Sequence, residues 1–260
     1  NENTLELLDL ENHLRHAIER NELDLLYQPK ICCESGNVIG AEALLRWKHP
    51  KLGVLQPDAF ISLAEETGMI ATIGYWVLKT ACLQNMIWRD KGVFKITMAV
   101  NLSADQFRQI DLYNNIKIIL EETNMLPKYL ELEITESITI ENFKKTIEAL
   151  ENLKKLGVVI AIDDFGTGYS SLSYLQQFPI DKVKIDRSFI KNITENKDSV
   201  SIVKAIIALA HSLNLTVISE GVETQAQYDL LRNMNCDEAQ GFYFGPAISA
   251  EEFEDFVTKS

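Results

Sequence analysis

The chain has 260 residues, of which 46% are hydrophobic and 24% are charged, a composition typical of a globular protein. Its net charge of -13 argues against non-specific binding to a nucleic-acid polymer or to an anionic membrane, whereas a small phosphate ligand held by metal ions remains compatible with it. No apolar run approaches the roughly 20 residues that a membrane span requires, so we expect no span in this chain.

The cysteines and histidines lack the spacing of a zinc site or a disulfide framework. Cys32 and Cys33 are adjacent, Cys82 and Cys236 are isolated, and none belongs to a CxxC pair. This use of cysteine indicates reduced thiols and a cytoplasmic compartment. A catalytic metal would therefore be held by oxygen ligands, which favours Mg²⁺ or Mn²⁺ over Zn²⁺.

The first part of the chain predicts a helix and a hairpin. Residues 3–20 have the pattern of an amphipathic helix, which either packs on the domain or ends a linker from an upstream domain. Strands are expected at 23–31 and 38–47, and the short turn between them predicts an antiparallel pair. Two helices, over 57–67 and 69–89, follow.

Strands and helices then alternate to the end of the chain. The expected strands are 95–101, 129–135, 158–163, 182–186, 215–220 and 238–244, and the expected helices are 111–123, 141–156, 170–177, 197–213, 224–233 and 250–257. This alternation predicts a mainly parallel sheet, and eight strands make a closed (β/α)8 barrel of the TIM type the simplest architecture. We therefore expect an N-terminal helix over 1–20 and one α/β barrel over 21–260.

Two adjacent acids end the predicted strand at 158–163. The apolar run from Val158 leads directly into Asp163 and Asp164, and a loop with Gly166 and Gly168 follows. Strand alternation directs the two carboxylates to opposite sides. Two acids at one strand end repel each other unless a cation lies between them. An acidic cap on the following turn is the alternative interpretation.

Polar residues recur where other predicted strands end. They are Glu42, Asn101, Glu133, Lys184, Glu220 and Gln240. Active groups of a barrel come from these carboxyl ends, and alternation directs Glu133 and Lys184 away from their apolar neighbours. With the adjacent aspartates there are five carboxylates and one ammonium, a formal charge near -4 that two divalent cations would balance. Singly, Lys184 could pair structurally with one acid, Asn101 could cap a turn, and Glu133 could be an ordinary rim carboxylate.

These residues lie in an ordered set of motifs. The motifs are EALLRW at 42–47, NLS at 101–103, EITE at 133–136, DDFGTGYSS at 163–171, KID at 184–186, EGVE at 220–223 and QGF at 240–242. Over nearly its whole length the chain thereby resembles the EAL-domain family of cyclic di-GMP-specific phosphodiesterases. The resemblance implies a barrel whose first strand is antiparallel to the rest, which agrees with the predicted hairpin. It also implies hydrolysis of cyclic di-GMP to linear pGpG with two Mg²⁺ or Mn²⁺ ions.

The resemblance further implies a role for each site residue. The implied metal ligands are Glu42, Asn101, Glu133, Asp163, Asp164 and Glu220. The implied catalytic residues are Glu220 as general base, Lys184, which helps to position the attacking water, and Gln240, which supports them. Gln28, Leu44, Arg46 and Asp186 are the implied substrate-binding residues, and Glu136, Gly166, Gly168 and Glu223 are implied to shape the surrounding loops. An arginine suits a phosphate because its planar fork donates two parallel hydrogen bonds.

Three functions stay open on the sequence. The first is an active phosphodiesterase, which the retention of every metal-ligand motif favours. The second is a catalytically silent module that binds cyclic di-GMP, and the third is a barrel enzyme that acts on another phosphodiester. The resemblance also implies a homodimer that forms near the 163–171 loop, and an upstream sensor or GGDEF-type domain in a longer parent protein.

Overall fold

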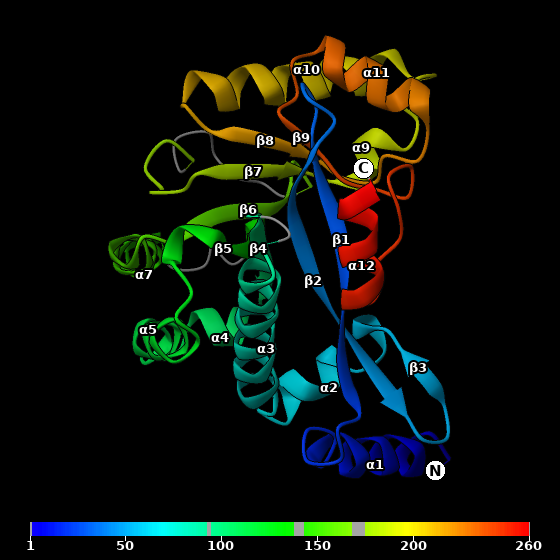
Figure 1. Ribbon diagram of the computed structural model, residues 1–260, viewed down its shortest axis with the longest axis vertical. Helices are drawn as coiled ribbons and strands as arrows, with labels where there is room; N and C mark the ends of the chain where they lie inside the picture. Colours follow the sequence, from blue (N-terminus) through cyan, green and yellow to red (C-terminus); the bar gives the residue numbers. More distant parts are fainter. Residues whose placement is uncertain (1, 93–94, 138–142, 168–174, 260) are drawn as a thin grey trace.

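The computed structural model describes residues 2–92, 95–137, 143–167 and 175–259. Within them, eight strands close a barrel, and one additional short strand lies outside the ring (Figure 1). The strands are β1 (Leu23–Cys32), β2 (Val38–His49), β3 (Gly53–Leu55), β4 (Thr97–Leu102), β5 (Leu130–Thr135), β6 (Val159–Phe165), β7 (Lys182–Ile185), β8 (Thr216–Ser219) and β9 (Glu238–Ala239).

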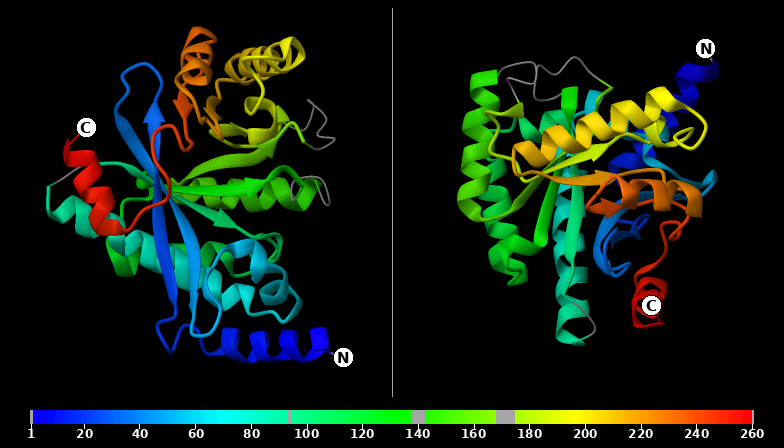
Figure 2. Two further views of the ribbon diagram at one scale, coloured as in Figure 1. Left: turned by 90° about the vertical axis from the view of Figure 1, so that its right-hand side faces the viewer. Right: turned by 90° about the horizontal axis from the view of Figure 1, so that it is seen from above.

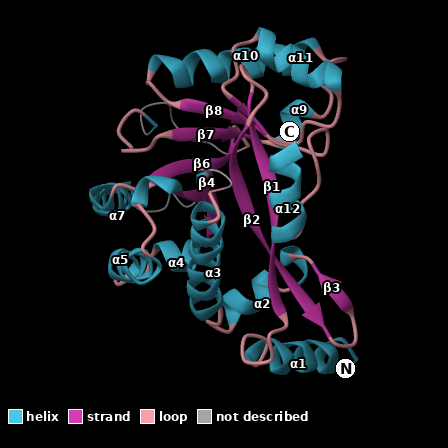
Figure 3. Cartoon of the chain, in the orientation of Figure 1, coloured by secondary structure: helices cyan, strands magenta, loops and turns pink. Residues whose placement is uncertain are grey.

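The order of the strands confirms the predicted barrel. The sheet runs β1-β9-β8-β7-β6-β5-β4-β2-β3, and a pairing between β1 and β2 closes the ring. Each neighbouring pair around the ring from β2–β4 to β8–β9 is parallel, whereas β1 is antiparallel to both of its neighbours. β3 pairs only with the far end of β2 and projects beyond the barrel (Figure 3).

Helices lie outside the sheet, as the views in Figure 2 show. They are α1 (Glu2–Arg15), α2 (Ile61–Glu66), α3 (Ile70–Asp90), α4 (Ala104–Phe107), α5 (Leu112–Thr123), α7 (Phe143–Leu156), α9 (Arg187–Ile190), α10 (Lys197–Ser212), α11 (Gln225–Asn233) and α12 (Ala250–Lys259), with short 3₁₀ helices at Pro57–Ala59 and Pro127–Tyr129. No helix in the described part of the chain has the length and apolar character that crossing a membrane requires.

Alternation along the strands separates an apolar outer face from a charged interior. On β5, Leu130, Leu132 and Ile134 are fully buried and belong to the hydrophobic core beneath the helices. The intervening Glu131 and Glu133 are also buried, on the opposite face of the strand. Because a buried charge without a partner costs several kcal/mol, these carboxylates require cations inside the barrel.

The last strand was predicted over 238–244, and this prediction is wrong beyond Ala239, where β9 ends. Gly241 packs so closely on the backbone of Val222 that a Cβ atom would lie 2.1 Å from the Val222 carbonyl oxygen. The backbone amide of Tyr243 then donates to that same carbonyl, and Phe244 closes a turn on Gly241. The chain therefore folds against the loop after β8 instead of continuing the ladder.

Other departures are smaller. The sequence analysis did not predict β3, α4 or α9, and α4 begins with a capping box formed by Ser103 and Gln106. The predicted helix at 170–177 lies mostly outside the described residues. α1 ends at Arg15, before the predicted position 20, and the buried Leu14 and Ala17 join the core. The division of the chain into an N-terminal segment, 1–20, and a barrel domain, 21–260, stays a prediction.

Candidate active site

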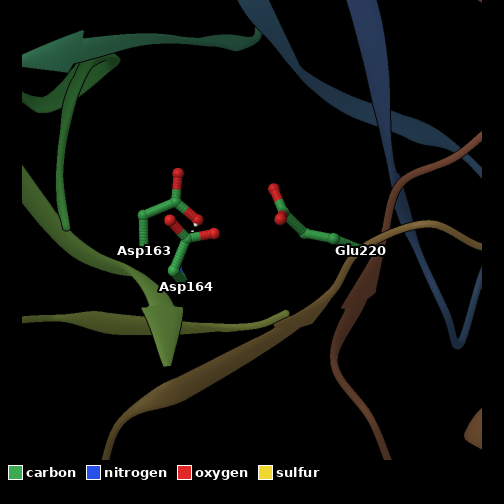
Figure 4. A group of neighbouring side chains, drawn as sticks. All are labelled: Asp163, Asp164 and Glu220. Atoms are coloured by element: carbon green, nitrogen blue, oxygen red, sulfur yellow. Dashed lines mark hydrogen bonds between the residues drawn. The ribbon is translucent and has the colours of Figure 1, made fainter. Parts of the chain in front are cut away.

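Three carboxylates converge at the carboxyl end of the barrel. Asp163 and Asp164 belong to the end of β6, and Glu220 directly follows β8. One oxygen of each lies within 4.8 Å of the others. Figure 4 shows the two aspartates side by side, with Glu220 opposite them. The structure therefore brings acids from two separate strand ends into one group.

The carboxylates of Asp163 and Asp164 were predicted to point to opposite sides of the strand, and this prediction is wrong. Asp164 has a φ of 55°, in the left-handed region, and the pairing of β6 with β7 shifts register between Ile162 and Phe165. This irregularity turns the second carboxylate to the same site as the first. Aspartate is one of the few residues other than glycine that adopt this conformation readily. The backbone amide of Asp164 also donates to Asp163 Oδ1 at 2.8 Å.

Lys184 provides a cation at the centre of these acids. Its fully buried Nζ lies 2.7 Å from Glu133 Oε2, 2.7 Å from Glu220 Oε1 and 3.0 Å from Asp163 Oδ2. Glu42 Oε2 is more distant, at 3.9 Å. One ammonium cannot neutralise acids that arrive from four strand ends. We call this set the mouth cluster: Glu42, Glu133, Asp163, Asp164, Lys184 and Glu220.

Two amide side chains fix the carboxylate of Glu42. Asn101 Nδ2 donates to Oε1 at 2.7 Å, and Gln240 Nε2 donates to Oε2 at 2.6 Å. Gln240 also donates to Gln28 Oε1 at 3.0 Å, and Gln28 donates to the Gly245 carbonyl at 3.2 Å. The Oε1 atom of Gln240 is buried and accepts no hydrogen bond from the described residues. It is an acceptor available to a ligand or a water molecule.

Crowding and burial change the acidity of the mouth cluster. Burial raises the pKa of Glu220 to about 8, against the opposing effect of the adjacent lysine, and Asp163 and Glu42 add to the rise. Burial and Glu42 raise the pKa of Glu133, and burial and Asp163 raise that of Asp164. These shifts mean that the cluster binds positive charge favourably, either as protons or as cations.

The loop after β6 is tied to the end of β5. The Gly166 amide donates to the buried Glu136 carboxylate at 2.9 Å. Gly166 has a φ of 98°, and a Cβ atom there would lie 3.0 Å from the Phe189 ring. Both facts favour glycine at this position. Gly168 lies outside the described residues.

Leu44 and Arg46 share a face of β2 with Glu42, because the three are spaced two residues apart. Both are partly buried, and Arg46 Nη1 donates to the Leu45 carbonyl at 2.8 Å. Beside them lies a largely apolar pocket of about 380 Å³. Residues that line it include Leu44, Leu45, Ile61, Ile73, Val77 and Asn101.

Asp186 and Glu223 have contacts outside the mouth cluster. Asp186 caps α9 by accepting hydrogen bonds from the backbone amide of Ser188, at 3.0 Å, and from its hydroxyl. It still lies near enough to Asp164 to add to the burial that raises the pKa of that residue. Glu223 is exposed, and its backbone amide donates to the Gln227 side chain at 2.7 Å. Their roles in the site stay predictions.

A second group of buried charges was missed by the sequence analysis. It lies one step deeper in the barrel, and we call it the lower layer: Lys30 on β1, Glu131 on β5, Lys182 on β7 and Glu238 on β9. Glu131, Lys182 and Glu238 each precede a predicted site residue by two positions, whereas Lys30 follows Gln28 because β1 runs the opposite way. The alternation used for Glu133 would have found all four.

The donor atoms of the site fit a hard divalent cation. The ligand candidates offer carboxylate and amide oxygens, which are the ligands of Mg²⁺ and Mn²⁺. The lower layer contributes two lysines and two glutamates, which cancel, so the mouth cluster retains its excess of five acids over one lysine. The orphaned Oε1 of Gln240 indicates a further polar occupant at the same place.

Fold and site together define a TIM-like barrel with an acid cluster at its carboxyl end. The EAL domain model matches residues 11–247, and the chain therefore belongs to the EAL domain family. This confirms the resemblance predicted from the motifs.

Several named proteins are similar to this chain. It is 46% identical over 252 residues to the bifunctional diguanylate cyclase/cyclic di-GMP phosphodiesterase MucR of Pseudomonas aeruginosa, covering 97% of this chain and 37% of MucR. It is 42% identical to the cyclic di-GMP phosphodiesterase NbdA of the same organism, covering 96% of this chain and 32% of NbdA. The solved PaMucR phosphodiesterase in complex with c-di-GMP has a TM-score of 0.91 and 45% identity, over 95% of this chain and 99% of that one. The chain thus spans about a third of the length of these curated relatives.

Proposed function

We propose that this chain is a metal-dependent hydrolase that converts cyclic di-GMP to linear pGpG. The observation that carries the proposal is the mouth cluster, where five carboxylates surround Lys184 in a member of the EAL domain family. MucR and NbdA are named as cyclic di-GMP phosphodiesterases, and the MucR domain was solved with c-di-GMP bound. These similarities support the same substrate for this chain.

The metal ligands in this proposal are Glu42, Asn101, Glu133, Asp163, Asp164 and Glu220. When bound, two Mg²⁺ or Mn²⁺ ions would supply Lewis-acid stabilisation of the phosphoryl oxygens and lower the pKa of water. The chain's own contribution is to hold these oxygens in place before substrate arrives, through the bonds of Lys184 and of the two amides on Glu42.

Glu220 acts as the general base in this proposal. Lys184 holds Glu220 Oε1 at 2.7 Å, which leaves Oε2 to take a proton from the attacking water. Gln240 Oε1, which is buried and accepts no hydrogen bond from the described residues, accepts one from the same water in this proposal. Attack at phosphorus then breaks one P–O bond of the cyclic substrate and gives the linear product. A positioned base of this kind contributes roughly 100- to 10,000-fold to the rate.

Arg46 and the adjoining pocket position the substrate. The guanidinium of Arg46 lies on the same strand face as Glu42, where it meets a phosphate of the substrate. The apolar pocket of about 380 Å³ beside Leu44 takes one base of the ligand. Gln28, bonded to Gln240, and Asp186, at the start of α9, complete this side of the site.

We also propose the setting of this domain. All four cysteines are free thiols, which supports a cytoplasmic location. The related MucR combines two enzymatic activities and DosP of Escherichia coli is named as an oxygen sensor protein, which supports an upstream sensor or GGDEF-type domain in the parent protein. A homodimer that forms near the loop after β6 belongs to the proposal too, and light scattering of the purified chain tests it.

The direct test is incubation of purified protein with cyclic di-GMP and Mg²⁺, followed by chromatography of the nucleotides. Appearance of linear pGpG supports the proposal. Tight binding without product would identify a catalytically silent receptor instead. Neither binding nor product would point to a barrel enzyme for another phosphodiester.

A further inference from the structure

The lower layer is a chain of ion pairs in the interior of the barrel. Lys30 Nζ lies 2.5 Å from Glu131 Oε1, and Lys182 Nζ lies 2.9 Å from Glu131 Oε2. Lys182 is also 2.7 Å from Glu238 Oε1. Two lysines and two glutamates from β1, β5, β7 and β9 thus neutralise each other. Taken alone, this arrangement explains only how the interior of the barrel tolerates charge.

Lys30 has one contact more than this structural role requires. Its Nζ also lies 2.5 Å from Glu133 Oε1, in the mouth cluster, and both side chains are fully buried. Lys182 contacts Glu131 and Glu238, and no ion pair between Lys182 and Glu133 exists among the described residues. Lys30 is therefore the lower-layer residue that reaches a candidate metal ligand.

The stem of Lys30 packs against the backbone of β2. Gly40 on β2 pairs directly with Lys30, and a Cβ atom at Gly40 would lie 3.4 Å from both Cβ and Cδ of Lys30, which is ordinary van der Waals contact. The same Cβ atom would lie 2.7 Å from Thr97 Oγ1, so a larger residue would require that hydroxyl to shift. Position 40 therefore favours glycine because of Thr97, and the stem of Lys30 lies alongside it.

Glu133 is consequently held from both sides. Lys30 binds its Oε1 from below, and Lys184 binds its Oε2 at 2.7 Å from the mouth. The terminal torsion of a glutamate is broad, so a carboxylate with a single partner can rotate. Two ammonium groups on two different oxygens remove that freedom and fix which oxygen faces the mouth.

We propose that Lys30 is a positioning residue, which fixes the Glu133 carboxylate so that its Oε2 is presented to a divalent cation at the mouth. This inference rests on the proposed function, because it concerns the same metal site. Glu131 is the anchor of Lys30, and Lys182 and Glu238 complete the neutral layer beneath. Partners that orient a metal ligand are typically worth about 10- to 100-fold in metal affinity or activity.

Two matched double variants separate positioning from stability. K30M/E131Q and K182M/E238Q each remove one lysine and one glutamate from the lower layer, and each leaves the other ion pair intact. Only K30M/E131Q removes the contact to Glu133. The measurements are Mn²⁺ binding to metal-stripped protein by electron paramagnetic resonance, kcat and KM with cyclic di-GMP, and the urea unfolding midpoint.

We expect K30M/E131Q to weaken Mn²⁺ binding about 10- to 100-fold and to lower kcat with little change in KM. K182M/E238Q should bind Mn²⁺ within about twofold of wild type, because the ion pairs of Lys182 are with Glu131 and Glu238 and not with a candidate metal ligand. In an E133Q background, K30M should cause no further loss of Mn²⁺ affinity, because Lys30 acts through Glu133. If K30M/E131Q is too unstable to purify, Lys30→Gln is measured with the same expectation.

Equal Mn²⁺ affinity in wild type and K30M/E131Q would overturn the inference, and so would an equal loss in both double variants. A further loss from K30M in the E133Q background would also overturn it. A wild-type protein that neither binds Mn²⁺ nor hydrolyses cyclic di-GMP would instead remove the proposed function, and this inference with it. The two failures are therefore distinguishable.

Discussion

The two layers of charge in this barrel share two strands, β5 and β7, and have the same residue types on them. β5 carries Glu131 in the lower layer and Glu133 in the mouth cluster, and β7 carries Lys182 and Lys184 in the same order. Each pair is separated by two positions, and all four side chains point into the barrel and lie within ion-pair distance of opposite charges. Residue type, burial and strand position therefore do not distinguish a functional layer from a structural one.

The difference lies in the balance of charge. The lower layer contains as many lysines as glutamates, and each of its carboxylates lies within ion-pair distance of a lysine. The mouth cluster has five acids for one lysine, and the pKa of Glu220 is raised to about 8, mainly by burial. In the lower layer the two acids differ: Lys30 and Lys182 overcome burial and lower the pKa of Glu131 to about 2, whereas burial raises the pKa of Glu238. A buried excess of one sign favours the binding of a counter-ion, whereas equal numbers of both signs can be balanced within the protein.

Replacing the two β5 glutamates by glutamine should give the largest contrast. Glu133→Gln removes a candidate metal ligand, and turnover of cyclic di-GMP should fall roughly 1,000-fold because several kcal/mol of metal-dependent stabilisation are lost. Glu131→Gln should reduce turnover by less than about tenfold, since it leaves the ligand in place. Initial rates with saturating Mg²⁺ measure both, and equal losses would contradict the division into layers.

Replacement of the two β7 lysines should affect different quantities, kcat for one and the free energy of unfolding for the other. Lys184→Met should lower kcat about 100-fold, because the general base loses its positioning partner, while substrate still binds. Lys182→Met should leave kcat nearly unchanged and lower the free energy of unfolding by roughly 3 kcal/mol, because Glu131 and Glu238 lose a shared buried cation. Kinetics and urea unfolding on the same preparations check this, and an inactive but equally stable Lys182→Met would argue against it.

Metal-linked stability should depend on the mouth cluster and not on Lys182. Mn²⁺ at about 100 times its Kd stabilises a binding protein by about 2.7 kcal/mol, which corresponds to a rise in Tm of roughly 5–10 °C for a domain of this size. Asp163→Asn should abolish most of this rise because it removes one of the three converging carboxylates. Lys182→Met should start from a lower Tm and show the full rise. Scanning calorimetry with Mn²⁺ and with EDTA distinguishes them.

The smallest expected effect is a change in acid stability from Glu131. Its pKa is lowered from an ordinary 4.5 to about 2, so its contribution to stability is fully present above pH 4.5 and is lost as the pH falls toward 2. Between pH 7 and pH 4 the loss from this one group should be on the order of 1 kcal/mol. Urea unfolding at pH 7, 5 and 4 should therefore show a shallower decline in Glu131→Gln than in wild type.

Periodicity was sufficient to predict most of the barrel. The alternation of strands and helices predicted the parallel order, and the four-residue turn after Cys33 predicted the antiparallel first strand. The alternation of side chains along β5 and β7 placed Glu133 and Lys184 inside the barrel. The same alternation applies to Lys30, but a lysine beside a proline in a first strand carries no chemical signal by itself, and it was missed. Its significance depends on Glu133, which lies 103 residues away.

Two features could not be read from periodicity, because each depends on a departure from regular strand geometry. The left-handed backbone at Asp164 returns its carboxylate to the site, against the period of two. The close approach of Gly241 to Val222 ends the last strand after Ala239. Adjacent acids and a glycine after a strand indicate that regular geometry stops, but only tertiary contacts determine the direction that the chain then takes.

The ion pairs of the lower layer also bear on how this protein reaches its folded state. Lys30 enters the chain early, its acid partners on β5 come about a hundred positions later, and Lys182 requires Glu238, 56 positions further on. A truncated chain that ends before β5 would leave the ammonium of Lys30 in water, without its acid partners. The ion pairs of the lower layer therefore contribute to the stability of the barrel only after β5, β7 and β9 have joined it.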